Sequence, residues 1–135
     1  MVGRALGGGT THRSVKALLA LLVVVGCGAS RVPRSLRGYD ILVEAADEQS
    51  VELARAMRSA GYHVRERVKG GSRPTAALIY FSFSEAGFDQ PTWLHVRLAD
   101  TRSGVIVGAA TIPLDSATMS TRARAEAAVL ALSAP

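Results

Sequence analysis

The sequence predicts an α+β fold in which two helices pack on one face of a mixed, mostly antiparallel sheet of four to five strands. Three observations favour this class. Apolar residues make up 48% of the 135 residues, which suits a chain with one core and not two domains. Strand-like alternation and helical spacing follow one another in the order β-α-β-β-β-β-α. The single cysteine excludes an internal disulfide framework and a multi-thiolate metal site.

The first strand and the first helix are expected between residues 39 and 60. Tyr39, Ile41 and Val43 occupy every second position, which indicates a strand with at least one buried face. Asp47 is a candidate N-cap, because its carboxylate can accept from the free amides of a first helical turn. Gly61 is a candidate for the residue that ends the helix, since glycine adopts the left-handed conformation readily.

Four strands and a second helix are expected in the rest of the chain. The strands cover residues 62–68, 76–83, 92–98 and 105–112. The run 76–83 is almost entirely apolar, which is typical of a central strand, and Trp93 is expected in the core. Residues 99–104 have the composition of a hairpin loop. Asp115 or Ser116 can cap the final helix.

The N-terminal residues have the features of a secretory signal. Arg4, Arg13 and Lys16 precede an unbroken apolar run at 17–25, and small residues follow it. The run is nine residues long. A membrane-spanning helix needs roughly 20 residues, so we expect a cleaved leader and no permanent transmembrane anchor.

Removal of this leader changes the charge of the chain. The full sequence carries a formal net charge of +5, but residues 1–26 contain three basic and no acidic residues. The remaining chain has a net charge of +2. Most of the basicity therefore belongs to targeting, and we expect no nucleic-acid partner, because such a partner requires a basic folded domain.

Residues that could support catalysis are few. Outside the leader the only histidines are His63 and His95, both in predicted strands. No serine lies in a Gly-x-Ser-x-Gly setting, and the Gly70-Gly71 pair precedes no Lys-Ser or Lys-Thr. We therefore expect a protein without catalytic residues, metal or cofactor. An enzyme that uses His63 or His95 stays open as an alternative.

A basic row is the main candidate binding feature of the mature chain. It lies on one side of the predicted strand 62–68 and comprises His63, Arg65, Arg67 and Lys69. The row can protect a sheet edge from pairing with other chains. It can equally bind an anionic ligand or a partner protein. Both explanations stay open.

Residues 27–38 are expected to form a tether before the folded domain. The segment contains glycine, proline and serine without periodicity. It also contains Arg31, Arg34 and Arg37, which could contact anionic headgroups or form a solvated linker. The expected organisation is therefore a leader at 1–26, a tether at 27–38 and a two-layer domain at 39–135.

The end of the leader, Val24-Val25-Gly26-Cys27, resembles the lipobox of bacterial lipoproteins. The resemblance implies cleavage before Cys27 and attachment of two or three fatty acids, such as palmitate, at that residue. One chain binds membranes only marginally, whereas two or three anchor a protein stably. Gly28 is not the aspartate that retains lipoproteins in the inner membrane, so the resemblance implies the periplasmic face of the outer membrane.

The whole mature chain resembles the LPS-assembly lipoprotein family. The residues that carry the likeness are Cys27-Gly28, Leu36-Arg37-Gly38, the helix 51–60 that ends at Gly61, and the apolar strand 76–83. Residues 98–105 resemble a hairpin shared by other envelope lipoproteins, among them penicillin-binding-protein activators and curli-secretion relatives. The likeness implies an assembly subunit with an outer-membrane β-barrel partner, and with LPS as a candidate ligand. An activator or scaffold of cell-wall synthesis or of a secretion apparatus is the alternative.

Overall fold

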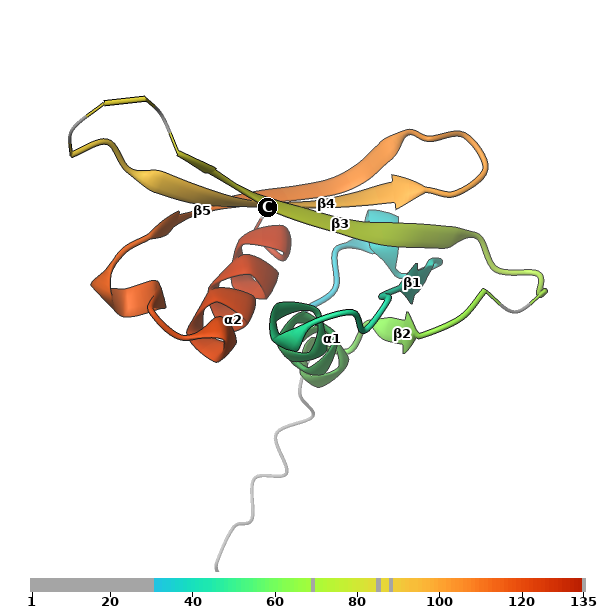
Figure 1. Cartoon of the computed structure of the whole chain (residues 1–135). Coiled ribbons are helices and arrows are strands. Elements are labelled where there is room, and N and C mark those ends of the chain that lie inside the picture. Colours follow the sequence, from blue (N-terminus) through green and yellow to red (C-terminus); the bar gives the residue numbers. More distant parts are fainter. Residues whose placement is uncertain (1–30, 69, 85, 88, 135) are drawn as a thin grey trace, which may run out of the picture.

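The computed structural model describes residues 31–68, 70–84, 86–87 and 89–134. Figure 1 shows two helices packed against one face of a twisted five-stranded sheet. The predicted α+β class and its element order are confirmed. The elements are η1 (Arg34–Leu36), β1 (Asp40–Leu42), α1 (Glu48–Ala60), β2 (His63–Arg65), β3 (Thr75–Ser84), β4 (Thr92–Asp100), β5 (Ile106–Leu114), η2 (Ser116–Thr118) and α2 (Thr121–Leu132).

The sheet has the strand order β2-β1-β3-β4-β5. β1 pairs in parallel with β2 and with β3, over three residues in each case. β3, β4 and β5 form a longer antiparallel meander in which Phe81 lies opposite His95, and His95 opposite Thr111. The parallel half needs the α1 crossover, whereas the antiparallel half needs only short connections.

Helix α1 begins and ends where the sequence predicts. The Asp47 carboxylate accepts from the backbone N–H of Ser50 at 2.8 Å, and the Ser50 hydroxyl accepts from the backbone N–H of Asp47 at 3.0 Å. This reciprocal pair satisfies amides that the first turn leaves free. Gly61 has a φ of 98°, and its N–H is donated to the carbonyl of Arg58. Only glycine adopts this conformation without a steric penalty.

The predicted strand 62–68 is wrong in its length. β2 ends at Arg65, and Arg67 lies beyond it in a bend. The cause lies in its neighbour, because β1 has only three residues and its register with β2 stops at the pair Leu42–Arg65. The backbone N–H of Val43 donates to the Arg65 carbonyl at 2.9 Å, and the ladder ends there, so the chain beyond Arg65 leaves the sheet.

Two further boundaries differ from the prediction. Asp115 caps the short turn η2 instead of a helix, and Ser120 caps α2 by accepting from the N–H of Ala123. At the other end, Val32 and Leu36 are buried in the core, so packed structure begins inside the segment expected to be a tether. A short 3-10 turn, η1, presents Leu36 to the core.

The core lies between the sheet and the helices. α1 contributes Leu53 and Met57, both fully buried, and β4 contributes Val96 and Leu98. Burial of such side chains stabilises the fold by roughly 1.5–3 kcal/mol each. α2 presents alanines, including the buried Ala125, which allow it to approach the sheet closely. No helix in the described part of the chain is long and apolar enough to cross a membrane.

Candidate functional site

Helices cover one face of the sheet, and large apolar side chains lie on the other. Ala76 of β3 is buried, while Leu78 and Tyr80 pack against the core. Successive residues of a strand point to opposite faces. Ile79, Phe81 and Phe83 therefore project from the uncovered face, and their exposed fractions are 47%, 42% and 53%.

The two neighbouring strands extend this surface. Phe83, Phe81 and Ile79 of β3 lie opposite Trp93, His95 and Arg97 of β4, which in turn lie opposite residues of β5. We call the resulting surface the open face; it comprises Ile79, Phe81, Phe83, Trp93, His95, Arg97, Ala109, Thr111 and Pro113. Contiguous exposed apolar surface of this kind is typical of an interaction site.

Aromatic and cationic groups are in contact at the centre of the open face. The rings of Phe81 and His95 are stacked, with centroids 5.0 Å apart and an interplanar angle of 13°. The guanidinium carbon of Arg97 lies 5.6 Å from the Phe81 centroid, within the range of a cation–π interaction. The Nδ1 atom of His95 is 3.1 Å from the Thr111 hydroxyl oxygen. These contacts join side chains of β3, β4 and β5 at the centre of the open face.

The electrostatics of the open face are simple. Arg97 is its one formally charged residue, and no carboxylate within the described ranges forms an ion pair with it. The surrounding side chains are aromatic, aliphatic or small. The arrangement can therefore hold an apolar surface that presents a carboxylate or another anionic group to Arg97.

The predicted basic row is only partly assembled. His63 and Arg65 lie on β2, at one edge of the sheet, and both are exposed. The Nε atom of Arg65 is 2.6 Å from an oxygen of Asp40, so its charge is already paired. Arg67 is beyond the strand, and Lys69 lies outside the described residues. The lipobox residue Cys27 also lies outside them.

Sequence reasoning missed the open face. The run 76–83 is the central strand, as predicted, but its outer side is exposed, because no element among the described residues covers it. Trp93 was expected in the core and instead lies on this outer side, so that expectation is wrong. One signal could have shown this. In β4, Leu94, Val96 and Leu98 alternate with Trp93, His95 and Arg97, which is the pattern of a strand buried on one face.

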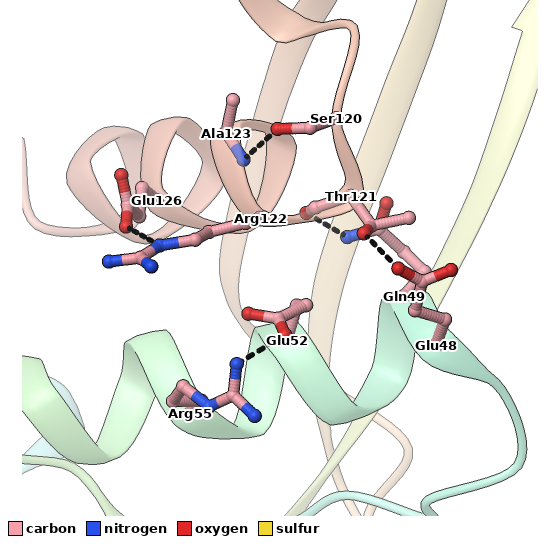
Figure 2. Close-up of polar contacts among 9 residues, drawn as sticks. All are labelled: Glu48, Gln49, Glu52, Arg55, Ser120, Thr121, Arg122, Ala123 and Glu126. Carbon is pink, nitrogen blue, oxygen red and sulfur yellow. Dashed lines mark hydrogen bonds and ion pairs between the residues drawn. The ribbon is translucent and has the colours of Figure 1, made fainter.

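A second concave surface lies between α1 and α2 and encloses about 570 Å³. Figure 2 shows its polar contacts: Arg55 pairs with Glu52 along α1, and Arg122 pairs with Glu126 along α2. The bond to Glu126 raises the pKa of Arg122. These four charges neutralise one another within their helices, whereas Arg31, which also lines the groove, forms no ion pair within the described residues.

Two further hydrogen bonds connect α1 to α2 beside this groove. Gln49 donates to the backbone carbonyl of Thr121 at 3.0 Å, and the Thr121 hydroxyl donates to Glu48 at 2.9 Å (Figure 2). They join the start of α1 to the start of α2. The described residues contain no group of three or more side chains suited to hold a metal ion.

No protein-family model matches this chain, and no curated protein matches it.

Proposed function

We propose that this protein is a non-enzymatic outer-membrane lipoprotein that acts as an accessory or assembly subunit of an envelope complex and docks a partner protein through its open face. The observation that carries the proposal is the row Ile79, Phe81 and Phe83, exposed on one side of a sheet whose other side is covered. The lipobox-like residues that end at Cys27 support the cellular location.

The position of Arg31, at the start of the described chain, indicates that the open face contacts a protein and not the membrane that holds the anchor. Arg31 lines the groove between α1 and α2, on the helical side of the sheet. Residues 27–30 span at most about 14 Å when fully extended. An acylated Cys27 would thus hold the helical side near the bilayer, and the open face lies on the opposite side of the sheet (Figure 1).

The chemistry of the open face defines the partner. It should bury aromatic and aliphatic side chains against Phe81 and Phe83, and offer a carboxylate to Arg97. The outer surface or rim of an outer-membrane β-barrel is the partner implied by the family likeness, with LPS as a further ligand. An enzyme or scaffold of cell-wall synthesis is the competing partner, and its identification in the experiment below would select that alternative.

A photo-crosslinking residue placed at Phe83 in living cells tests the proposal. Phe83 is 53% exposed, so the substitution should leave the core intact. We expect one dominant cross-linked envelope protein, and loss of most of the product when Arg97→Glu is added, because that change places a repulsive charge in the interface.

The matched control is the same photo-crosslinker at Val68, which is 65% exposed and lies outside the open face. It should give little or none of this product. Equal yields from the two positions, or a product indifferent to Arg97→Glu, would show that the open face does not dock the partner.

A further inference from the structure

Two basic segments far apart in the sequence meet near the start of the described chain. A terminal nitrogen of Arg73 donates to the backbone carbonyl of Arg37 at 2.9 Å. Arg73 and Arg65 flank the buried carboxylate of Asp40, at nitrogen–oxygen distances of 3.9 Å and 2.6 Å. Arg37 and His63 also line one shallow depression of about 230 Å³. We call five arginines the basic cluster: Arg37, Arg65 and Arg73, which these contacts join, and Arg34 and Arg67, which lie within three residues of Arg37 and Arg65 on the same segments.

Positive charge is in excess at this cluster. Asp40 is the carboxylate between Arg65 and Arg73, and both arginines remain more than two-fifths exposed. Glu66 directly follows Arg65 in the sequence, and Arg58, which lies outside the cluster, pairs with it at 3.6 Å. The Asp100 carboxylate accepts from the Tyr39 hydroxyl at 3.0 Å and forms no ion pair with the cluster. Arg34 and Arg67 form no ion pair within the described residues. Each can therefore neutralise an external anion.

Protection of the sheet edge explains only part of the cluster. β2 is an edge strand, so charged residues such as Arg65 do keep it from pairing with other chains. Arg34, Arg37 and Arg73 do not belong to any strand. Edge protection gives no reason for arginines on these neighbouring segments, whereas recognition of an extended anionic surface does.

We infer that the basic cluster binds the phosphate headgroups of an anionic phospholipid bilayer and holds the domain against the membrane. The charges are spread over η1 and the residue after it, over β2 and the bend after it, and over the loop before β3. They do not surround a deep pocket, which suits a plane of headgroups better than one small anion. The location rests on the proposed function, since Arg34 is only seven residues from Cys27. Acyl chains and a basic patch together form a stable two-part anchor.

Vesicle co-sedimentation tests the inference. The protein is the chain 27–135 with Cys27→Ser, which lacks acyl chains and contains the whole described core, from Val32 to Leu132. Vesicles of phosphatidylcholine are compared with vesicles that also contain phosphatidylglycerol. We expect binding to the anionic vesicles only, weakened by salt. The pair Arg34→Gln and Arg67→Gln should reduce it by roughly 25-fold, since each basic residue near such a surface contributes about fivefold.

The matched control is the pair Arg102→Gln and Arg124→Gln, which removes the same charge from residues that lie outside the basic cluster and the open face and form no ion pair within the described ranges. It should retain most of the binding. If the cluster variant and the control variant lost equal amounts of vesicle binding, net charge alone would explain the binding, and the inference would be overturned. Equal binding to neutral vesicles, or complete competition by soluble glycerol phosphate, would do the same. Vesicle binding by the basic cluster does not depend on the cross-link at Phe83. The membrane proposal and the docking proposal can therefore fail separately.

Discussion

Asp47 links helix α1 to the sheet through a single carboxylate. It accepts from the backbone N–H of Ser50 as the cap of α1, and both of its oxygens lie 2.6 Å from the phenol oxygen of Tyr80 on β3. The Tyr80 hydroxyl is the largest cause of a lowered pKa at Asp47, followed by the Ser50 amide. Because Tyr80 packs against the core, the cap also fixes where α1 starts relative to β3.

We expect Tyr80→Phe to raise the pKa of Asp47 toward its ordinary value. The pKa of Asp47 is lower in the folded than in the unfolded chain, so its contribution to stability is present above the unfolded value and is lost as the pH falls through the folded one. The variant should lose less stability on acidification than the wild type. Titration of the Asp47 carboxyl carbon by NMR, with parallel urea unfolding, measures both effects.

The control for this experiment is Tyr39→Phe. The Tyr39 hydroxyl donates to Asp100 at 3.0 Å and has no contact with Asp47. The Tyr39→Phe variant should therefore leave the pKa of Asp47 unchanged. An Asp47 pKa that does not move in Tyr80→Phe would contradict the assigned cause.

At the scale of elements, η1 and β5 pack together because β5 contains a glycine. A Cβ atom at Gly108 would lie 3.2 Å from Cδ1 of Leu36 and 3.2 Å from Cδ1 of Leu98. Such separations are tighter than normal contacts, so a side chain there must displace its neighbours. Gly108 therefore allows Leu36 to complete the core at the end of the sheet.

We expect Gly108→Val to destabilise the protein by about 1–3 kcal/mol, the usual cost of overpacking a core. The change should also release η1, which would appear as faster amide exchange at Leu36. Urea unfolding and hydrogen exchange provide the two measurements. Ala109→Val is the matched control, since its side chain lies on the open face next to Gly108 and should cost less than 1 kcal/mol. Equal destabilisation by the two variants would contradict this packing.

The two edges of the sheet differ in a way that bears on docking. β2 is three residues long and carries His63 and Arg65, whereas β5 is nine residues long and carries no charged residue. Two other features interrupt the β5 edge. Pro113 lacks a backbone N–H, and the register with β4 shifts between Leu98 and Ala99. Proline and irregular register both discourage strand addition at an edge. The open face, and not the edge, is accordingly the surface we assign to the partner.

At the scale of the whole molecule, the proposed surfaces belong to different parts of the fold. The basic cluster lies on η1, β2 and the loop before β3, and the open face lies on the outer side of β3, β4 and β5 (Figure 1). A domain held at the bilayer by the first surface can keep the second available. This division of surfaces is what an anchored accessory subunit requires.

We expect the wild-type protein to incorporate labelled palmitate at Cys27 and to sediment with outer membranes. Cys27→Ser should abolish the label and move the protein into the soluble periplasmic fraction or the inner membrane, because the basic cluster alone binds more weakly than acyl chains. Labelling of cells followed by membrane fractionation provides the measurement. Wild-type protein that carries no fatty acid and remains in the cytosolic fraction would contradict the proposed anchor.

Local chemistry in the sequence determined most of the fold. The cap at Asp47, the stop at Gly61 and the apolar run of β3 are short-range signals, and with the other strand and turn patterns they were sufficient for the element order and the α+β class. These signals work because each depends on neighbouring residues alone. The lipobox-like residues at Cys27 are of the same kind, and the anchor they indicate stays a prediction.

Tertiary structure alone decided the candidate sites. Whether the apolar strand β3 is covered on both faces depends on how many helices the chain supplies, and both pack on the same side. The length of β2 depends on β1. The meeting of Arg37, Arg65 and Arg73 depends on the parallel pairing of β1 with β2 and β3, which places the residues before β1 beside the loop before β3. Contacts between distant residues leave no periodic trace in a sequence, which is why the basic cluster emerged only from the folded chain. The open face left one trace, the alternation in β4, but only the fold shows that β3 and β5 extend it.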